Sequence, residues 1–137
     1  FNYKNENEEF LIYGYENEFK HVLLNIINNA KNKIIEKNLP INKKGSIDIN
    51  IKRCEESNMI EIIDDAGAID EKIINSIFEP YFTTKEDGMG LGLYMAKIII
   101  EDKMKGTINV RNYKNCVIFT INLPFKRIKN ENFTFRR

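Results

Sequence analysis

The stretch IFEPYFTTKEDGMGLGL, residues 77–93, is the most informative part of the sequence. Its glycines stand at positions 88, 90 and 92, just before an apolar stretch with helical spacing. Alternating glycines let backbone N–H groups gather around a phosphate where a helix begins, although a flexible hinge is the alternative. The dinucleotide fingerprint is excluded because Leu93 stands where its third glycine is needed, and no Gly-Lys pair of a P-loop occurs.

The residues ahead of these glycines combine aromatic side chains with a cation. Phe78, Tyr81 and Phe82 are followed by Lys85, three residues before the first glycine. A mobile lysine at that place can close over a triphosphate. Taken alone, however, the aromatic cluster is better explained by packing of a loop onto the core.

Upstream, residues 16–38 predict a long helix, which Pro40 ends. Its apolar stripe consists of Phe19, Leu23, Ile26, Ala30 and Ile34. Beside it, the carboxamides of Asn25, Asn28, Asn29 and Asn32 share a face roughly 100° wide. Carboxamides offer neutral oxygens to a hard cation and N–H donors to phosphate. A solvated polar face is the alternative in a chain this rich in asparagine.

A carboxylate ends the most apolar strand. In IEIIDDAGAI, residues 60–69, Asp64 follows a buried strand and precedes small residues, which let a flat ligand approach the backbone. Such a carboxylate can accept a hydrogen bond from an exocyclic amine like that of adenine. An ordinary acidic turn is the alternative.

The remaining patterns complete an α+β fold. Strands are predicted at 9–14, 46–53, 59–63, 107–111 and 117–123, and further helices at 70–78 and 91–104. Short turns between neighbouring strands indicate a mixed, mostly antiparallel sheet with three helices on one face, a two-layer α/β sandwich. We expect one domain over 1–137 with its core at about 10–124, polar and frayed residues at 1–9, and a basic, loosely held tail at 125–137.

Composition limits the functional classes. The 137 residues are 42% hydrophobic and 30% charged, with a net charge of +1, which argues against a nucleic-acid binder. Cys54, Cys116 and the single His21 are too few for a disulfide framework or a Cys/His zinc site. No apolar run approaches the roughly 20 residues of a membrane span, and no leader opens the chain. We therefore expect a cytoplasmic domain without direct membrane contact.

Together and in this order, four segments resemble the ATP-binding catalytic (HATPase) domain of bacterial sensor histidine kinases. That domain belongs to the GHKL superfamily, with DNA gyrase B subunits, MutL and the ninety-kilodalton heat-shock chaperone, and has the Bergerat-type ATP-binding fold. LNIINNA (24–30) resembles the N box, IDDAGAI (63–69) the first glycine box, FEPYFTTK (78–85) the F box and GMGLGL (88–93) the second glycine box. The F box belongs to the kinase branch.

The resemblance implies a role for each matching residue. Asn25 and Asn29 would hold Mg²⁺ and the phosphates of ATP, Asp64 would accept from the adenine amine, and Asn25 and Lys85 would serve phosphoryl transfer. The implied nucleotide site consists of Asn25, Asn29, Lys33, Asp64, Gly67, Ile69, Phe82, Lys85, Gly88, Met89, Gly90, Leu91, Gly92, Leu93 and, through water, Thr120.

Three features depart from the family pattern. Ala66 and Ala68 replace the two glycines expected in the first glycine box, and at position 68 a methyl group disfavours a positive φ and a close ligand. Asn32 replaces a frequent Lys or Arg, for which Lys33 can substitute. The lid over 82–88 is short.

The implied function is transfer of the γ-phosphate of ATP to a histidine on a separate dimerisation domain, in two-component signalling with a response regulator receiver domain. His21 lies inside the nucleotide-binding helix and is interpreted as an ordinary helix residue. The phosphoacceptor domain is absent from this chain, and membrane anchoring of the full protein would come from an upstream region. A conformational ATPase is disfavoured because Asn25 stands where that branch has its Glu base. A degenerate interaction module, supported by Ala68, is the other alternative.

Overall fold

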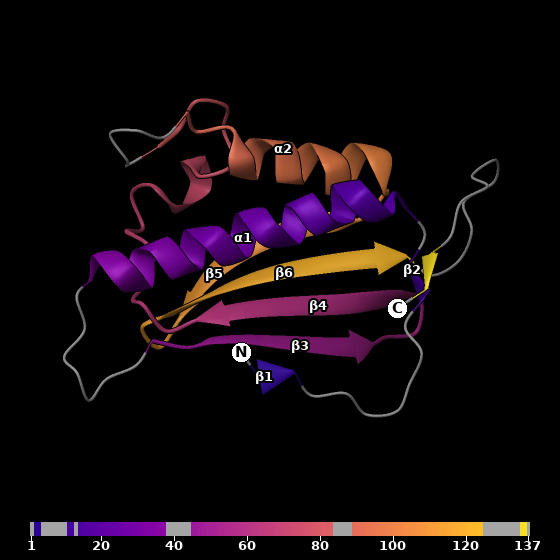
Figure 1. Cartoon of the computed structure of the whole chain (residues 1–137), viewed down its shortest axis with the longest axis horizontal. Helices are drawn as coiled ribbons and strands as arrows, with labels where there is room; N and C mark the ends of the chain where they lie inside the picture. The colour runs from indigo at the N-terminus through magenta and orange to yellow at the C-terminus, as the bar shows by residue number, and fades with distance from the viewer. Residues whose placement is uncertain are drawn as a thin grey trace.

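The fold is a sheet with helices over one face. The computed structural model describes residues 2–3, 11–12, 14–37, 45–83, 89–124 and 135–136. Helices α1 and α2 lie side by side over the sheet, as Figure 1 shows, which confirms the predicted two-layer α+β architecture. The elements are β1 (Asn2–Tyr3), β2 (Leu11–Ile12), α1 (Glu16–Glu36), β3 (Ile47–Arg53), β4 (Ser57–Asp64), the 3₁₀ helix η1 (Ile74–Ser76), α2 (Gly92–Ile98), the π-helix η2 (Ile99–Lys103), β5 (Thr107–Tyr113), β6 (Cys116–Pro124) and β7 (Phe135–Arg136).

The main sheet has five strands in the order β1-β3-β4-β6-β5. β1 runs parallel to β3, and the other neighbours are antiparallel, so the sheet is mixed and mostly antiparallel as predicted. A separate two-stranded sheet pairs β2 with β7. The ends of the chain therefore contribute strands where the sequence pattern predicts frayed termini. Residues 4–10 and 125–134 lie outside the described part of the chain.

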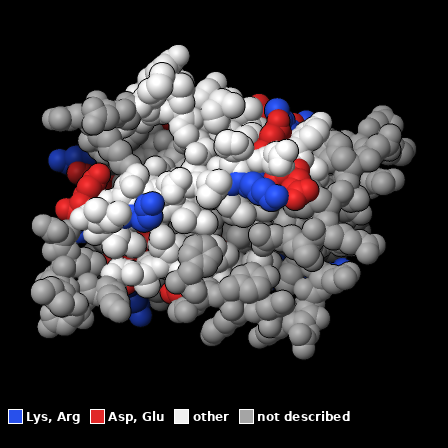
Figure 2. Space-filling view, in the orientation of Figure 1, with Lys and Arg blue, Asp and Glu red and all other residues white. Residues whose placement is uncertain are grey.

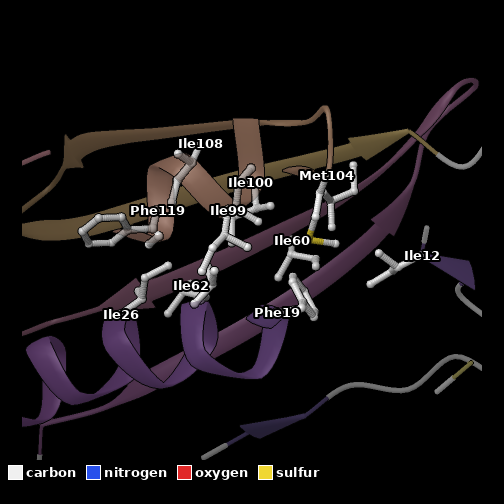
Figure 3. Packing of buried hydrophobic residues seen from close by; sticks show 14 of the residues in the cluster. Ile12, Phe19, Ile26, Ile60, Ile62, Ile99, Ile100, Met104, Ile108 and Phe119 are labelled. Carbon is white, nitrogen blue, oxygen red and sulfur yellow. The ribbon is translucent and has the colours of Figure 1, made fainter. Parts of the chain in front are cut away.

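The register of β4 places one face of the sheet under the helices. Ile49 of β3 and Phe119 of β6 lie opposite Ile62 of β4, so their side chains share the helix side. On α1, Phe19 and Ile26 face this surface (Figure 3) and are almost completely buried. Burial of this apolar stripe against the sheet holds α1 in place, because helix propensity alone gives little stability.

Two predicted helices differ from the structure. Residues 70–78 form turns and η1 rather than an α-helix, because the Asp70 carboxylate takes the N–H of Lys72 and the chain soon reaches Pro80. The helix predicted at 91–104 starts as α2 and continues as η2. In this wider turn Ile99, Ile100 and Met104 are all buried in the core.

Candidate functional site

A pocket of about 430 Å³ opens between α1, the end of β4 and the start of α2. This volume lies in the range of small-molecule sites, roughly 300–1,000 Å³. Side chains from α1, from the segment after β4 and from the glycine-rich segment line it together. The lining residues are Asn29, Ala30, Lys33, Glu36, Asp64, Ile69, Ile73, Ile77, Phe82, Thr83, Met89, Gly90, Leu91, Gly92, Leu93 and Phe119.

Asp64 is the buried polar group of this pocket. It is the last residue of β4, a strand paired on both sides, and only 2% of its surface is exposed. Oδ1 of Asp64 accepts the N–H of Ala66 at 3.2 Å and lies 2.9 Å from the ammonium of Lys33. A buried carboxylate requires such partners, since an unpaired buried charge is strongly destabilising.

Lys33 reaches Asp64 from the last turn of α1. Its Nζ also donates to the carbonyl oxygen of Gly67 at 3.3 Å, so the ammonium lies between the strand end and the segment that follows it. The sequence predicts Lys33 as a substitute for a phosphate-binding cation. In the structure its ammonium pairs instead with the carboxylate of Asp64, the residue expected to bind the adenine amine.

Asn112 fixes the wall of the pocket at Ile69. The Ile69 N–H donates to Oδ1 of Asn112 at 2.9 Å, and the Asn112 amide donates to the Ile69 carbonyl at 2.7 Å and to Glu71 at 2.9 Å. Asn112 is not among the site residues predicted from the sequence. One signal could have revealed it: Asn112 continues the helix-side face of β5 set by Ile108 and Val110, where a polar residue is out of place.

The backbone after β4 accommodates the alanines of the first glycine box. Gly67 has φ +107°, which only glycine adopts readily, whereas Ala66 and Ala68 are not among the residues with positive φ. Ala68 is exposed and does not line the pocket. The expectation that Ala68 strains the backbone is therefore wrong, because the single glycine stands where the left-handed conformation is needed.

The other end of the pocket is formed by the glycine-rich segment. Gly90 has φ +69°, and a Cβ there would lie 2.5 Å from the backbone of Tyr81 and Phe82. The N–H of Tyr81 donates to the Gly90 carbonyl at 2.9 Å and joins the aromatic segment to the glycines. On α1, Asn25 donates through its amide nitrogen to the Gly92 carbonyl at 3.2 Å. Its side-chain oxygen is thus the atom left to face a cation.

The predicted site residues converge only in part. Asn25 contacts Gly92 but does not line the pocket, and Gly67 reaches it through Lys33. Lys85 and Gly88 lie outside the described residues. Those that the structure brings together around the pocket are Asn29, Lys33, Asp64, Ile69, Phe82, Met89, Gly90, Leu91, Gly92 and Leu93.

Thr120 is a wrong prediction. It lies opposite Glu61, three residues out of phase with Asp64, so its side chain points to the face of the sheet away from the helices. Val117 is the β6 residue that pairs with Asp64.

Among the described residues, the face drawn in Figure 2 carries no broad patch of one charge. In Figure 2 the described Lys and Arg side chains of this face lie scattered among Asp and Glu. Among the described residues there is no group of three or more His, Cys, Asp or Glu side chains placed to hold a metal ion. Within the same residues, no helix has the length and apolar character needed to cross a membrane.

Comparisons with known proteins agree on one family. Residues 14–127 match the family described as Histidine kinase-, DNA gyrase B-, and HSP90-like ATPase. Sporulation kinase A of Bacillus subtilis is 35% identical over 122 residues, which cover 88% of this chain and 19% of that protein. The sensor histidine kinase ZraS of Salmonella typhimurium is 37% identical over 105 residues, covering 75% of this chain and 21% of ZraS. The chain thus spans about a fifth of the length of these relatives.

Solved structures show the same fold. The catalytic domain of the histidine kinase ThkA superposes with a TM-score of 0.70 at 30% identity, over 82% of this chain and 70% of that one. The histidine kinase ThkA in complex with the response regulator protein TrrA gives 0.71 at 27% identity, over 90% of this chain and 33% of that one. The chain therefore belongs to the histidine kinase-, DNA gyrase B- and HSP90-like ATPase family.

Proposed function

We propose that this chain is the catalytic domain of a histidine kinase, which binds Mg²⁺ and ATP and donates the γ-phosphate to a histidine on a separate dimerisation domain. The observation that carries the proposal is the polarity of the pocket. A buried carboxylate, Asp64, lies at one end, and asparagine and glycine-rich backbone lie at the other. This arrangement suits a ligand with a base at one end and phosphates at the other.

The phosphate end has the chemistry for a metal-bound triphosphate. Asn29 lines the pocket there, and Asn25 lies one turn earlier on α1 with its carboxamide beside Gly92. Neutral amide oxygens satisfy Mg²⁺ when phosphate oxygens supply the negative charge. Because the described residues form no acidic metal cluster, an ion in this site would depend on the nucleotide for ligands.

No histidine that could accept a phosphoryl group lines the pocket. Phosphoryl transfer depends mainly on in-line positioning and charge neutralisation. His21 is exposed on α1 one turn before Asn25 and does not line the pocket. Asn25 and Asn29 carry amides and cannot act as a base toward water. We therefore propose that the acceptor is a histidine from another domain.

The partners follow from the relatives. Sporulation kinase A and ZraS are kinases, and the ThkA structure contains a response regulator. We extend this to the chain: its phosphoryl group passes from the acceptor histidine to a receiver domain, and it acts in the cytoplasm, without nucleic acid. Lys85 and the lid stay predictions, because they lie outside the described residues.

A degenerate interaction module is the second candidate, and Ala68 is its support. The glycine at position 67 takes the left-handed conformation instead, so the alanines cause no backbone strain. An equilibrium titration with a non-hydrolysable ATP analogue and Mg²⁺ separates the two candidates, since the degenerate module would bind weakly or not at all.

The transfer itself is tested with γ-labelled ATP. We expect no acid-labile label on the isolated chain, and label on a histidine-bearing helical hairpin from a related kinase when it is added. The His21→Ala variant should label that hairpin as well as the parent does. Label on the isolated parent that His21→Ala abolishes would overturn the assignment and make the chain self-phosphorylating.

A further inference from the structure

The base end of the pocket holds a fixed cation beside the fixed carboxylate. Nζ of Lys33 is 2.9 Å from Oδ1 of Asp64 and 3.3 Å from the carbonyl oxygen of Gly67. The side chain of Lys33 is 28% exposed and that of Asp64 is 3% exposed, so the lysine is the more accessible partner of the pair. Both residues line the pocket.

With the described residues as partners, neither group uses all of its hydrogen-bonding atoms. A lysine ammonium has three N–H donors, and Asp64 and Gly67 occupy two of them. The N–H of Ala66 and the ammonium both contact Oδ1 of Asp64, and neither contact uses Oδ2. A ligand thus meets one acceptor and one donor side by side, with apolar Ile69 and Phe119 among the lining residues.

Purine bases differ at the edge that would face this pair. Adenine presents an amine donor at position 6 and an acceptor at N1, while guanine and hypoxanthine present an acceptor at O6 and a donor at N1. A carboxylate alone favours adenine, because O6 would face negative charge without a donor. A carboxylate beside an ammonium can pair with either edge in two placements of the base. In one the adenine amine donates to the carboxylate and N1 accepts from the lysine, and in the other the N1 hydrogen of a 6-oxopurine goes to the carboxylate and O6 accepts from the lysine.

We propose that Lys33 determines the base specificity of this domain by making the pocket tolerant of 6-oxopurine nucleotides as well as adenine nucleotides. The inference rests on the proposed function, because it requires a purine nucleotide in the pocket with its base at Asp64. The competing role for Lys33 is neutralisation of Asp64 alone, in which case the lysine would only compete with any base for the carboxylate.

The test compares ADP with inosine diphosphate, which differ only at the N1–C6 edge of the base. Calorimetric titrations without metal give the ratio of the two dissociation constants for the parent, Lys33→Met, Lys33→Arg and Lys31→Met. Lys31 is exposed on the same helix and serves as the matched control for loss of one charge. Thermal melts followed by circular dichroism show which variants are folded.

We expect Lys33→Met to raise the ratio of the inosine to the adenosine dissociation constant by about tenfold or more, since a buried oxygen without a donor costs roughly 5- to 150-fold in binding. Lys33→Arg, which keeps the charge and the donors, and Lys31→Met should keep the parental ratio. An unchanged ratio in folded Lys33→Met would overturn the inference, and equal tightening of both nucleotides would assign Lys33 to competition alone.

Two further outcomes are decisive. If Lys33→Met does not fold, the parent protein provides the test. A ratio of the inosine diphosphate to the ADP dissociation constant below about 30 supports the inference, and a larger ratio contradicts it. This threshold lies inside the range expected for an unpaired buried group. If the parent binds neither nucleotide, the proposed function fails and this inference fails with it. If every variant binds ADP and not inosine diphosphate, the inference about Lys33 is wrong, and the proposed function is unaffected.

Discussion

Asn25 donates a hydrogen bond to the carbonyl oxygen of Gly92 over 3.2 Å and so links α1 to the first residue of α2. The contact holds the carboxamide beside the glycine-rich segment. It also gives Asn25 a structural role that is independent of any ion.

Asn25→Ala should therefore weaken binding of Mg²⁺ and ATP strongly and binding of metal-free ADP only slightly. The lost hydrogen bond to Gly92 contributes about 1 kcal/mol and affects both ligands, while loss of a metal ligand affects only the first. Calorimetry on both ligands measures the difference, with Asn28→Ala, an exposed neighbour, as the control. Equal losses for the two ligands would assign Asn25 to structure alone.

Asp64→Asn should lower the affinity for ATP by about 1–3 kcal/mol, because the amide replaces one acceptor oxygen with an NH2 donor, which cannot pair with the adenine amine, and removes the negative charge. The adjacent Asp65 offers a matched control. Its carboxylate binds the backbone N–H and the hydroxyl of Ser46 on the exposed side of the strand end. Asp65→Asn should leave nucleotide affinity unchanged, and an equal effect of the two substitutions would remove Asp64 from the base site.

Substitution by alanine should lower the stability of the fold at Gly90 but leave it nearly unchanged at Gly92. Gly90→Ala places a Cβ 2.5 Å from backbone at φ +69°, and the left-handed conformation alone costs about 1–2 kcal/mol. At Gly92 the nearest atom to an added Cβ is 3.6 Å away, on Asn25. Gly92→Ala should therefore change the free energy of unfolding by less than about 0.5 kcal/mol. Chemical denaturation of both variants checks this, and similar losses would contradict it.

Asn112→Ala should weaken nucleotide binding by about 1–3 kcal/mol, because it leaves the N–H and carbonyl of Ile69 without their partner and loosens the pocket wall. Asn109→Ala, at an exposed position on the other face of the same strand, is the control. If Asn112→Ala binds ATP like the parent, Ile69 does not depend on this clamp.

Ala68→Gly should leave nucleotide affinity unchanged, since Ala68 is exposed, outside the pocket lining and not in the left-handed region. Gly67→Ala should reduce stability instead, because φ at Gly67 is +107°. Paired melting and titration experiments on the two variants test the assignment. A gain in affinity from Ala68→Gly would restore the idea that alanine impairs this segment.

Local sequence patterns are sufficient to predict the main helix and the main strands. Ile47, Ile49 and Ile51 alternate with polar residues and form one face of β3, and the apolar stripe of residues 19–34 predicts α1 to within two residues at its end. The predicted residues that do line the pocket come from motifs that end a strand, follow a helix face and precede a helix. The positions of these residues in the fold follow from the local sequence pattern and from packing of helices on one face of a sheet.

Contacts between distant segments are not visible in the pattern. The run of apolar residues at 117–119 hides which face of β6 is buried, and only the pairing of Asp64 with Val117 shows that Thr120 points away. The ion pair of Lys33 with Asp64 joins residues 31 positions apart, and the Asn112 clamp joins residues 43 apart. Both depend on how α1 and the last hairpin settle on the sheet.

The place of Asp64 at the end of a central strand has a consequence for how the domain opens. We expect amides of β4, which is paired with strands on both sides, to exchange mainly when the sheet unfolds, whereas the single hydrogen bond from Tyr81 N–H to the Gly90 carbonyl can break in a smaller opening. The lifetime of the fold and the lifetime of the binding-competent site are then separate quantities. Amide exchange in β4 measures the first, and amide exchange at Tyr81 measures the second. A variant can shorten the second by orders of magnitude while leaving the first as it was.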